Sequence, residues 1–327
     1  MKNANHAPSF RKLNLGAAMK SSFWSVFALL LLGFECTFAG TFEDGVAAFE
    51  AKDSVVALRL LVPLAEQGDR QSQFIVGSIY YRGIGVPQNE TQALKWLRMA
   101  AEQGTPEAQF NVGNLNFYGK RTPHNAVESV KWWRLAAEGG HAGAQTNMGY
   151  AYEMGIGVKL DYVEAVKWYK LAANQNHPQA QHSLAAAYQW GHGVTKDDAE
   201  AARLYRLAAE QGIASSQAML GGIYLNGQGV EVDYGEALKW TRLAFAQAEL
   251  PAIVYMGLMY LEGKGVSQDY LRAYTCFDML ADSDDKGLVD FASQKLRDLA
   301  GRMQSKQITD AKELSKACRQ RKFKDCL

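Results

Sequence analysis

A single spacing of 36 residues runs through most of this 327-residue chain. Glycine recurs at that step, and a second glycine and a valine follow two and three residues after it; the first glycines are Gly83, Gly119, Gly155, Gly191, Gly227 and Gly263. The second glycine is replaced once, by Arg121. A fixed period of this length is typical of solenoids, in which each repeat packs on its neighbours. The sequence predicts six repeats, 72–107, 108–143, 144–179, 180–215, 216–251 and 252–287.

Each repeat reads as two helices joined by the Gly-x-Gly-Val loop. Helix A carries small residues and tyrosines and ends at the first glycine, for which we expect the left-handed conformation. Helix B follows an N-capping residue, which is Asn89, Asn125, Asp161, Asp197, Asp233 or Asp269. A Glu or Gln three residues later suggests a capping box in all but the last repeat. A phosphate-binding loop would be needed once, after a strand, so a loop repeated six times between helices is a structural device.

Helix B carries a stripe that predicts the core. Trp96, Trp132, Trp168 and Trp240 keep the 36-residue step, and Leu204 and Cys276 fill the other two positions. We expect this column to be buried and Cys276 to be an unreactive thiol. A column of cations on helix B is interpreted as a solvated face, because Glu128, Glu164, Glu200 and Glu236 stand three residues before four of them; pairs are also expected at Arg98–Glu102, Arg134–Glu138 and Arg206–Glu210.

The pattern A-Q-x-x-x-G-x-x-Y-x-x-G-x-G-V-x-x-D-x-x-x-A-x-x-W-x-x-x-A-A is close to complete in residues 144–173. It resembles the Sel-one-like repeat (SLR) family, the 36-residue relatives of tetratricopeptide repeats, over roughly residues 40–287. The resemblance implies an all-α fold, a right-handed α/α superhelical solenoid of helix-turn-helix repeats. Residues 40–71 are then expected to form an N-terminal helical pair, and residues 288–327 to form C-terminal capping helices.

The N-terminal residues predict export. Basic residues precede an apolar run of 12, Phe23–Phe34, and small residues flank Phe38 at Thr37 and Ala39. This pattern is typical of a secretory signal peptide over residues 1–39, cleaved after Ala39. The run is too short to span a bilayer, which needs about 20 residues. The start of translation stays open between Met1 and Met19. In an oxidising periplasmic or extracellular space, Cys318 and Cys326 are expected to form a disulfide.

The sequence gives little support for catalysis, metals, cofactors or nucleic acid. A formal net charge of +1 provides no electrostatic reason to expect nucleic acid as a partner. The motifs G-x-S-x-G, H-E-x-x-H and C-x-x-C do not occur. Some secreted SLR proteins carry a disulfide in every repeat and are linked to binding or cleaving β-lactams. This chain has no cysteine pair within its repeats, so we interpret it as no enzyme. A hydrolase of the β-lactam or cell-wall type remains the alternative.

Positions that vary between repeats are candidates for recognition, since the scaffold positions repeat. Three variable columns of helix A share one face by their spacing of three and four residues, and the resemblance implies that helix A lines the concave side. The predicted partner-binding residues are Asn111, Asn114, Tyr118, Asn147, Tyr150, Met154, Ser183, Trp190, Asn226 and Tyr255. Aromatic anchors of this kind are typical of interface hot spots. Our hypothesis is a non-enzymatic scaffold that binds a protein or peptide in this groove, with a glycan-binding scaffold as a further alternative.

Overall fold

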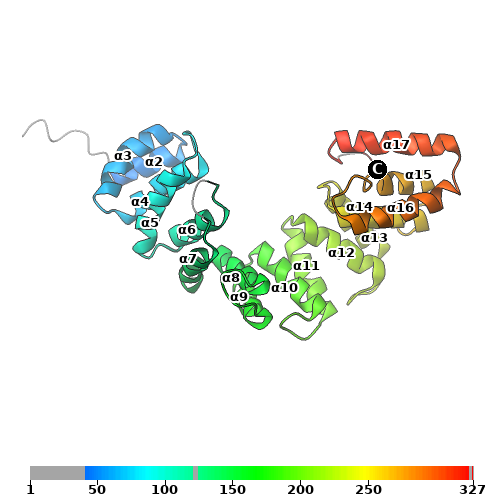
Figure 1. The fold of residues 1–327 in the computed structure, drawn as a ribbon, viewed down its shortest axis with the longest axis horizontal. Coiled ribbons are helices and arrows are strands. Elements are labelled where there is room, and N and C mark those ends of the chain that lie inside the picture. The colour runs from blue at the N-terminus through cyan, green and yellow to red at the C-terminus, as the bar shows by residue number, and fades with distance from the viewer. Residues whose placement is uncertain (1–40, 121–123, 324–325, 327) are drawn as a thin grey trace, which may run out of the picture. The chain divides into compact units, whose positions relative to one another are not determined.

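The structure is a computed structural model that describes residues 41–120, 124–323 and 326. The predicted signal peptide and Arg121 lie outside these residues. All regular secondary structure in the described ranges is helical (Figure 1). The helices are α2 (Phe42–Glu50), α3 (Ser54–Glu66), α4 (Arg70–Arg82), α5 (Glu90–Glu102), α6 (Pro106–Tyr118), α7 (Ala126–Glu138), α8 (Ala142–Met154), α9 (Tyr162–Asn174), α10 (Pro178–Trp190), α11 (Asp198–Glu210), α12 (Ala214–Asn226), α13 (Tyr234–Phe245), α14 (Leu250–Glu262), α15 (Tyr270–Asp278), α16 (Lys286–Ala300) and α17 (Ser305–Gln320).

The chain divides into two units. The N-terminal unit, Met1–Asn89, contains α2, α3 and α4, which pack on one another in chain order. Leu61 of α3 is fully buried and lies so close to Gly45 of α2 that any side chain at Gly45 would collide with it. The absence of a side chain at Gly45 therefore sets how closely α2 approaches α3.

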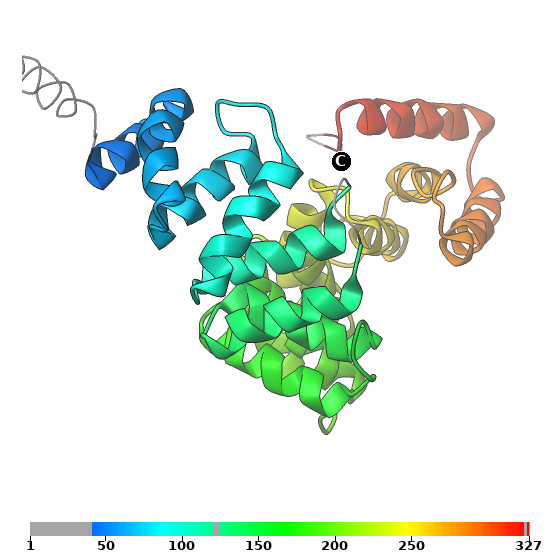
Figure 2. The same ribbon diagram turned by 60° about the vertical axis from the view of Figure 1, so that its left-hand side comes forward.

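The C-terminal unit, Glu90–Leu327, contains α5 to α17, and each helix from α6 to α15 packs on the helix before it (Figures 1 and 2). Here α6, α8, α10, α12 and α14 are the A helices of their repeats, and α7, α9, α11, α13 and α15 are the B helices. Contacts such as Asn147 with Asn114 and Tyr255 with Gly222 join neighbouring A helices. Arg98 with Glu128 and Arg206 with Glu236 join neighbouring B helices. The helices of this unit therefore form an A layer and a B layer, as a solenoid requires.

The loops follow the expected geometry in all repeats but one. Gly83, Gly155, Gly191, Gly227 and Gly263 end their helices in the left-handed region, with φ between 65° and 71°. The second glycines have positive φ as well. Gly119 differs, with φ −62° and ψ 132°, so the expectation of a left-handed residue is wrong there. This is the repeat whose second glycine is replaced in the sequence, and its helix therefore ends by another route.

The capping boxes expected for α7, α9, α11 and α13 form only by half. The capping Asn or Asp of α7, α9, α11, α13 and α15 accepts the backbone N–H three residues later, at 3.0 Å in each case. The return bond from the Glu side chain is not needed, because the N–H of each capping residue already donates to a helix A carbonyl nine residues earlier, as Asp161 does to Tyr152 at 2.9 Å. The glutamates are thereby free to bind other groups, and the capping-box prediction was wrong on this point.

The core confirms most of the tryptophan column and corrects one member. Trp96, Trp168 and Trp240 are buried, as are Leu204 and Cys276. Trp132 is only half-buried, whereas its neighbour Trp133 is fully buried. The physical reason lies in helix A, where Gly113 leaves room that the indole of Trp133 fills.

The same arrangement recurs along the stack. Gly149 lies against Tyr169 and Gly257 against Phe277, again with no space for a Cβ atom. The helix B residue of this column always stands 20 residues after a small residue of helix A. The sequence analysis missed this second buried column because its members differ in type, as Leu97, Trp133, Tyr169, Tyr205, Thr241 and Phe277.

The last two helices cover the end of the stack. Both α16 and α17 pack against α15, and the hydroxyl of Thr275 in α15 donates to the carbonyl of Ala311 in α17 at 3.2 Å. A disulfide joins Cys318 to Cys326. Phe323, inside that loop, stacks edge-on against Phe245 of α13 with ring centroids 5.6 Å apart. The C-terminal residues thus seal the hydrophobic core of the final repeat.

Candidate functional site

The predicted aromatic residues of helix A lie at the surface. Tyr118 at the end of α6 is 62% exposed and Trp190 at the end of α10 is 66% exposed, while Tyr150 and Met154 of α8 are 40% and 56% exposed. Exposed apolar patches on a soluble protein often mark sites of interaction. We call the surface formed by the variable positions of the A helices the A face.

Two asparagines of the A face bind each other. Asn147 of α8 donates its Nδ2 to Oδ1 of Asn114 in α6 at 3.0 Å. The same Oδ1 accepts the indole N–H of buried Trp133 at 3.0 Å. The pair therefore links the surface of the A face to the core column beneath it.

Tyrosines and one carboxylate continue this network. Burial raises the pKa of Tyr118, and nearby Tyr150 adds to the rise. Tyr169 donates its hydroxyl to Oε2 of Glu153 at 2.6 Å, and burial, followed by this hydrogen bond, raises the pKa of Tyr169. Ser183 of α10 also hydrogen bonds to Tyr169. Residues from α6, α8 and α10 are thus brought together.

The remaining predicted residues are placed differently. Asn111 is half-buried on α6. Asn226 is exposed at the end of α12, where its Nδ2 donates to the carbonyl of Gly222 at 3.0 Å. Tyr255 of α14 is half-buried over Gly222, and burial raises its pKa. Asn226 and Tyr255 therefore belong to the junction of α12 with α14.

Sequence reasoning did not find Glu153 and Gln189. Each accepts a hydrogen bond from a buried tyrosine of the following helix B, Glu153 from Tyr169 and Gln189 from Tyr205 at 2.9 Å. A signal was present, because the two acceptors stand one period apart and each precedes its tyrosine by 16 residues. These hydrogen bonds connect the A helices to the buried tyrosines of the B helices.

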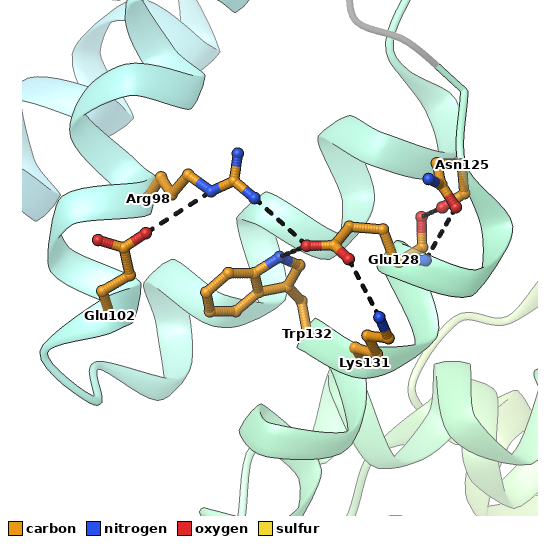
Figure 3. Close-up of polar contacts among 7 residues, drawn as sticks. Arg98, Glu102, Asn125, Glu128, Lys131 and Trp132 are labelled. Atoms are coloured by element: carbon orange, nitrogen blue, oxygen red, sulfur yellow. Dashed lines mark hydrogen bonds and ion pairs between the residues drawn. The ribbon is translucent and has the colours of Figure 1, made fainter.

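The opposite face, formed by the B helices, carries compensated charge. Glu128 of α7 accepts the indole N–H of Trp132 at 3.0 Å and pairs with Lys131 at 3.7 Å and with Arg98 of α5, the preceding B helix, at 3.3 Å (Figure 3). The other three expected pairs also form, at 2.7–3.0 Å, between Lys167 and Glu164, Arg203 and Glu200, and Lys239 and Glu236. These pairs confirm the interpretation of this column as a solvated ionic face.

The expected pairs four residues apart are only partly correct. Arg98 does pair with Glu102 at 3.7 Å. Arg134 instead donates to the hydroxyl of Tyr152 at 2.8 Å, and Arg206 donates to the hydroxyl of Tyr224. The guanidinium groups lie over these tyrosine rings at 5.7 and 5.4 Å from the centroids. A tyrosine 18 residues later competes successfully with the exposed glutamate, because a partly buried ring adds cation–π attraction to the hydrogen bond.

The histidines hold structural contacts. His141 caps α8 by accepting the N–H of Ala144 at 3.1 Å, His177 contacts the Thr146 hydroxyl at 3.0 Å, and His182 contacts the hydroxyl of Ser216 at 2.7 Å. Burial lowers the pKa of all three imidazoles. In the described part of the chain, no group of three or more His, Cys, Asp or Glu side chains gathers as metal ligands would.

The thiol of Cys276 is not part of a disulfide and lies in the core. Cys276 is fully buried, and burial raises the pKa of its thiol, which keeps the sulfur protonated as expected. Across the residues that the structure places, every helix is too short or too polar to cross a bilayer.

Comparison with known families identifies the class of protein. The model of the Sel1 repeat matches six segments, residues 70–105, 106–141, 142–177, 178–213, 214–248 and 250–285. The chain belongs to the Sel1 repeat family, as the 36-residue pattern indicated. The matched segments begin two residues before the repeats drawn from the sequence, since each A helix starts earlier than its apolar pattern. Sel1 repeats generally serve as scaffolds for protein–protein interaction and are typically non-catalytic.

Two solved structures resemble the chain over most of its length. One is a protective antigen of uropathogenic Escherichia coli strains that displays an SLR fold, with a TM-score of 0.74 and 29% identity over 83% of this chain. The chain spans 56% of that antigen's length. The other is a Sel1 repeat protein from Oxalobacter formigenes, with a TM-score of 0.65 and 30% identity, covering 78% of this chain and 100% of the other. No curated protein sequence matches the chain.

Proposed function

We propose that this protein is an exported, non-enzymatic scaffold of the cell envelope that binds a partner protein through the A face. The observation that carries the proposal is the exposure of four large side chains, Tyr118, Tyr150, Met154 and Trp190, on three consecutive A helices. Aromatic and methionine side chains are enriched in interface cores, where they contribute most of the binding energy. On the B face the exposed large side chains are mainly aliphatic, such as Leu135 and Leu171, and most charged side chains are paired with one another.

The site of action is part of the proposal. A basic segment, a short apolar run and small residues before a cleavage position support export. The disulfide between Cys318 and Cys326 supports the same assignment, because such bonds persist in oxidising compartments. Within the envelope, an interaction scaffold fits an adaptor or regulator of assembly, polysaccharide secretion, signalling or host contact.

Site-specific photocrosslinking in cells tests the proposal. A photoreactive amino acid is introduced at Tyr150 and at Trp190 on the A face, and at Lys167 on the B face as the matched control. Lys167 is a suitable control because its exposed side chain belongs to an ion pair with Glu164. Crosslinks to one discrete protein from Tyr150 and Trp190 alone support a scaffold and identify its partner.

Two other outcomes would contradict the proposal. Equal crosslinking from all three positions contradicts an interface confined to the A face. If no position yields a protein adduct, the scaffold proposal fails, and binding of cell-wall glycans and turnover of β-lactams or peptidoglycan become the next assays.

A further inference from the structure

The asparagine pair on the A face occurs at a single junction of the repeats. Asn114 and Asn147 stand 33 residues apart on α6 and α8 and share a hydrogen bond. At the following junctions the corresponding positions hold Tyr150 with Ser183, Ala186 with Met219, and Gly222 with Tyr255. Contacts that build the solenoid recur from repeat to repeat. For example, the side chains of Gln109, Gln145 and Gln217 each donate to an alanine carbonyl at 3.1 Å. The asparagine pair is therefore a feature of this surface and not of the repeat.

The contacts of the pair fix which way both amides face. The indole N–H of Trp133 can only donate, so the atom of Asn114 beside it must be the oxygen. That oxygen also accepts the Nδ2 of Asn147, which uses both of its lone pairs. Two atoms are left over, the Nδ2 of Asn114 as a donor and the Oδ1 of Asn147 as an acceptor. Among the described residues, neither of these two atoms has a hydrogen-bonding partner.

A donor and an acceptor on two hydrogen-bonded amides can match one residue of an extended peptide. In a β-strand, a residue directs its own N–H and C=O to the same side, which is how facing residues exchange two hydrogen bonds. A single trans amide, such as the acetamido group of a sugar, points its N–H and C=O in opposite directions. The pair could satisfy only one group of such an amide, so the acetamido group of a sugar is a poorer match for it than the backbone of an extended residue.

We propose that Asn114 and Asn147 hold the backbone of one residue in an extended segment of the partner. Asn114 donates its Nδ2 to the carbonyl of that residue, and Asn147 accepts its N–H. The exposed rings of Tyr118 and Tyr150 stand on the same two helices and contact the side chains that flank the bound residue. Neither amide is charged, so this part of the binding energy depends little on salt. The inference rests on the proposed function and specifies the chemistry of its site.

Side-chain amide resonances of the 15N-labelled full chain provide the readout. The probe is a blocked pentapeptide of alternating valine and tyrosine, titrated to about 5 mM, which detects even millimolar affinity. A set of analogues replaces each backbone N–H in turn with an ester oxygen. An N-acetylglucosamine oligosaccharide is titrated in parallel as the glycan source of an amide. We expect saturable shifts of Asn114 and Asn147 with the peptide, and binding about tenfold weaker for one ester analogue, which has lost the hydrogen bond to Asn147.

A matched pair of variants tests the donor. Asn114→Asp keeps an oxygen for Trp133 and for Asn147 but replaces the outward donor with an acceptor. We expect it to weaken peptide binding by at least about tenfold while Tm stays close to that of the parent. Asn174→Asp makes the same change at an exposed position of α9 and should bind as the parent does. If Asn114→Asp fails to fold, the ester series on the unmodified chain decides by itself.

Three results would overturn the inference. They are a peptide that shifts neither side-chain amide, a series of esters that all bind as tightly as the parent peptide, and shifts produced by the oligosaccharide alone. Crosslinking in cells separates this failure from that of the proposed function. A partner captured equally well with Asn114→Asp contradicts the amide pair alone, whereas no captured partner in the unmodified protein contradicts the scaffold itself.

Discussion

Replacing each of two adjacent tryptophans should give very different losses of stability. Trp133 is fully buried against Gly113, and Trp132 is half-buried with its N–H on Glu128. A buried tryptophan removes about 200 Å² from water, which at about 25 cal/mol per Å² corresponds to about 5 kcal/mol. Measured losses for such truncations are about 3–5 kcal/mol, and we expect Trp133→Ala to fall in that range.

Trp132→Ala should cost less. Half of the same area corresponds to about 2.5 kcal/mol, and the partly buried hydrogen bond to Glu128 adds at most about 1 kcal/mol. The difference between the two variants is therefore expected to be about 2 kcal/mol. Urea unfolding followed by circular dichroism measures both free energies, and amide hydrogen exchange localises the loss to α6, α7 and α8 in case the repeats do not unfold as one transition.

A second substitution tests the cause of the difference. Gly113→Ala alone should destabilise the protein, because the added methyl collides with the indole of Trp133. In the Trp133→Ala background the same methyl enters the space left by the ring and should be neutral or stabilising. A cost for Trp132→Ala equal to that of Trp133→Ala, or equal effects of Gly113→Ala in both backgrounds, would refute the assignment of Trp133 as the core residue.

Three further outcomes follow from the fold. Gly193→Ala should destabilise the protein by more than Gly104→Ala in urea unfolding. Both glycines have positive φ, which costs a non-glycine residue about 1–2 kcal/mol, but only Gly193 lies against a backbone carbonyl, that of Tyr162. Equal losses of stability would contradict this contact. Burial lowers the pKa of His182 below its ordinary value of 6.5, so its unfolded form binds the proton more readily, and the stability that it contributes is complete above pH 6.5 and declines as the pH falls below that value. His182→Gln should therefore flatten the change in urea midpoint between about pH 7.5 and 5.5, and an unchanged slope would refute the effect. Cys276 should react with a thiol reagent about a hundredfold more slowly in the folded protein than in urea, because its thiol is buried and protonated; fast labelling of the folded chain would exclude that environment.

The sequence predicted the fold well because its determinants are local and repeated. A glycine with positive φ, an Asp or Asn cap and an apolar stripe each act within one repeat. Because these features recur in the six repeats, each repeat predicts the same pair of helices. The structure departs where a single copy differs, as at Gly119, whose repeat has lost its second glycine. The pattern assigned Gly119 the conformation of the equivalent glycines, whereas its φ is negative.

The candidate site was only partly accessible to such reasoning. Exposure of Tyr118 and Trp190 could be expected from the face on which they lie. The bond between Asn114 and Asn147 could not, because it depends on the orientation of two side chains from neighbouring repeats. Trp133 was overlooked for a related reason, since its column contains Thr241 and Phe277 as well and only the gap above Gly113 shows why a large ring fits there.

The hydrogen bond from each helix B cap to a helix A carbonyl has a consequence for how such genes change length. The bond joins two residues of the same repeat, such as Asp197 to Tyr188 at 3.0 Å. A tandem duplication of 36 codons therefore copies donor, acceptor and intervening loop together, wherever in the repeat the recombination begins. Gain or loss of a whole repeat keeps this hydrogen bond in every remaining repeat. Natural variants of this chain should therefore differ in length by multiples of 36 residues more readily than by any other number.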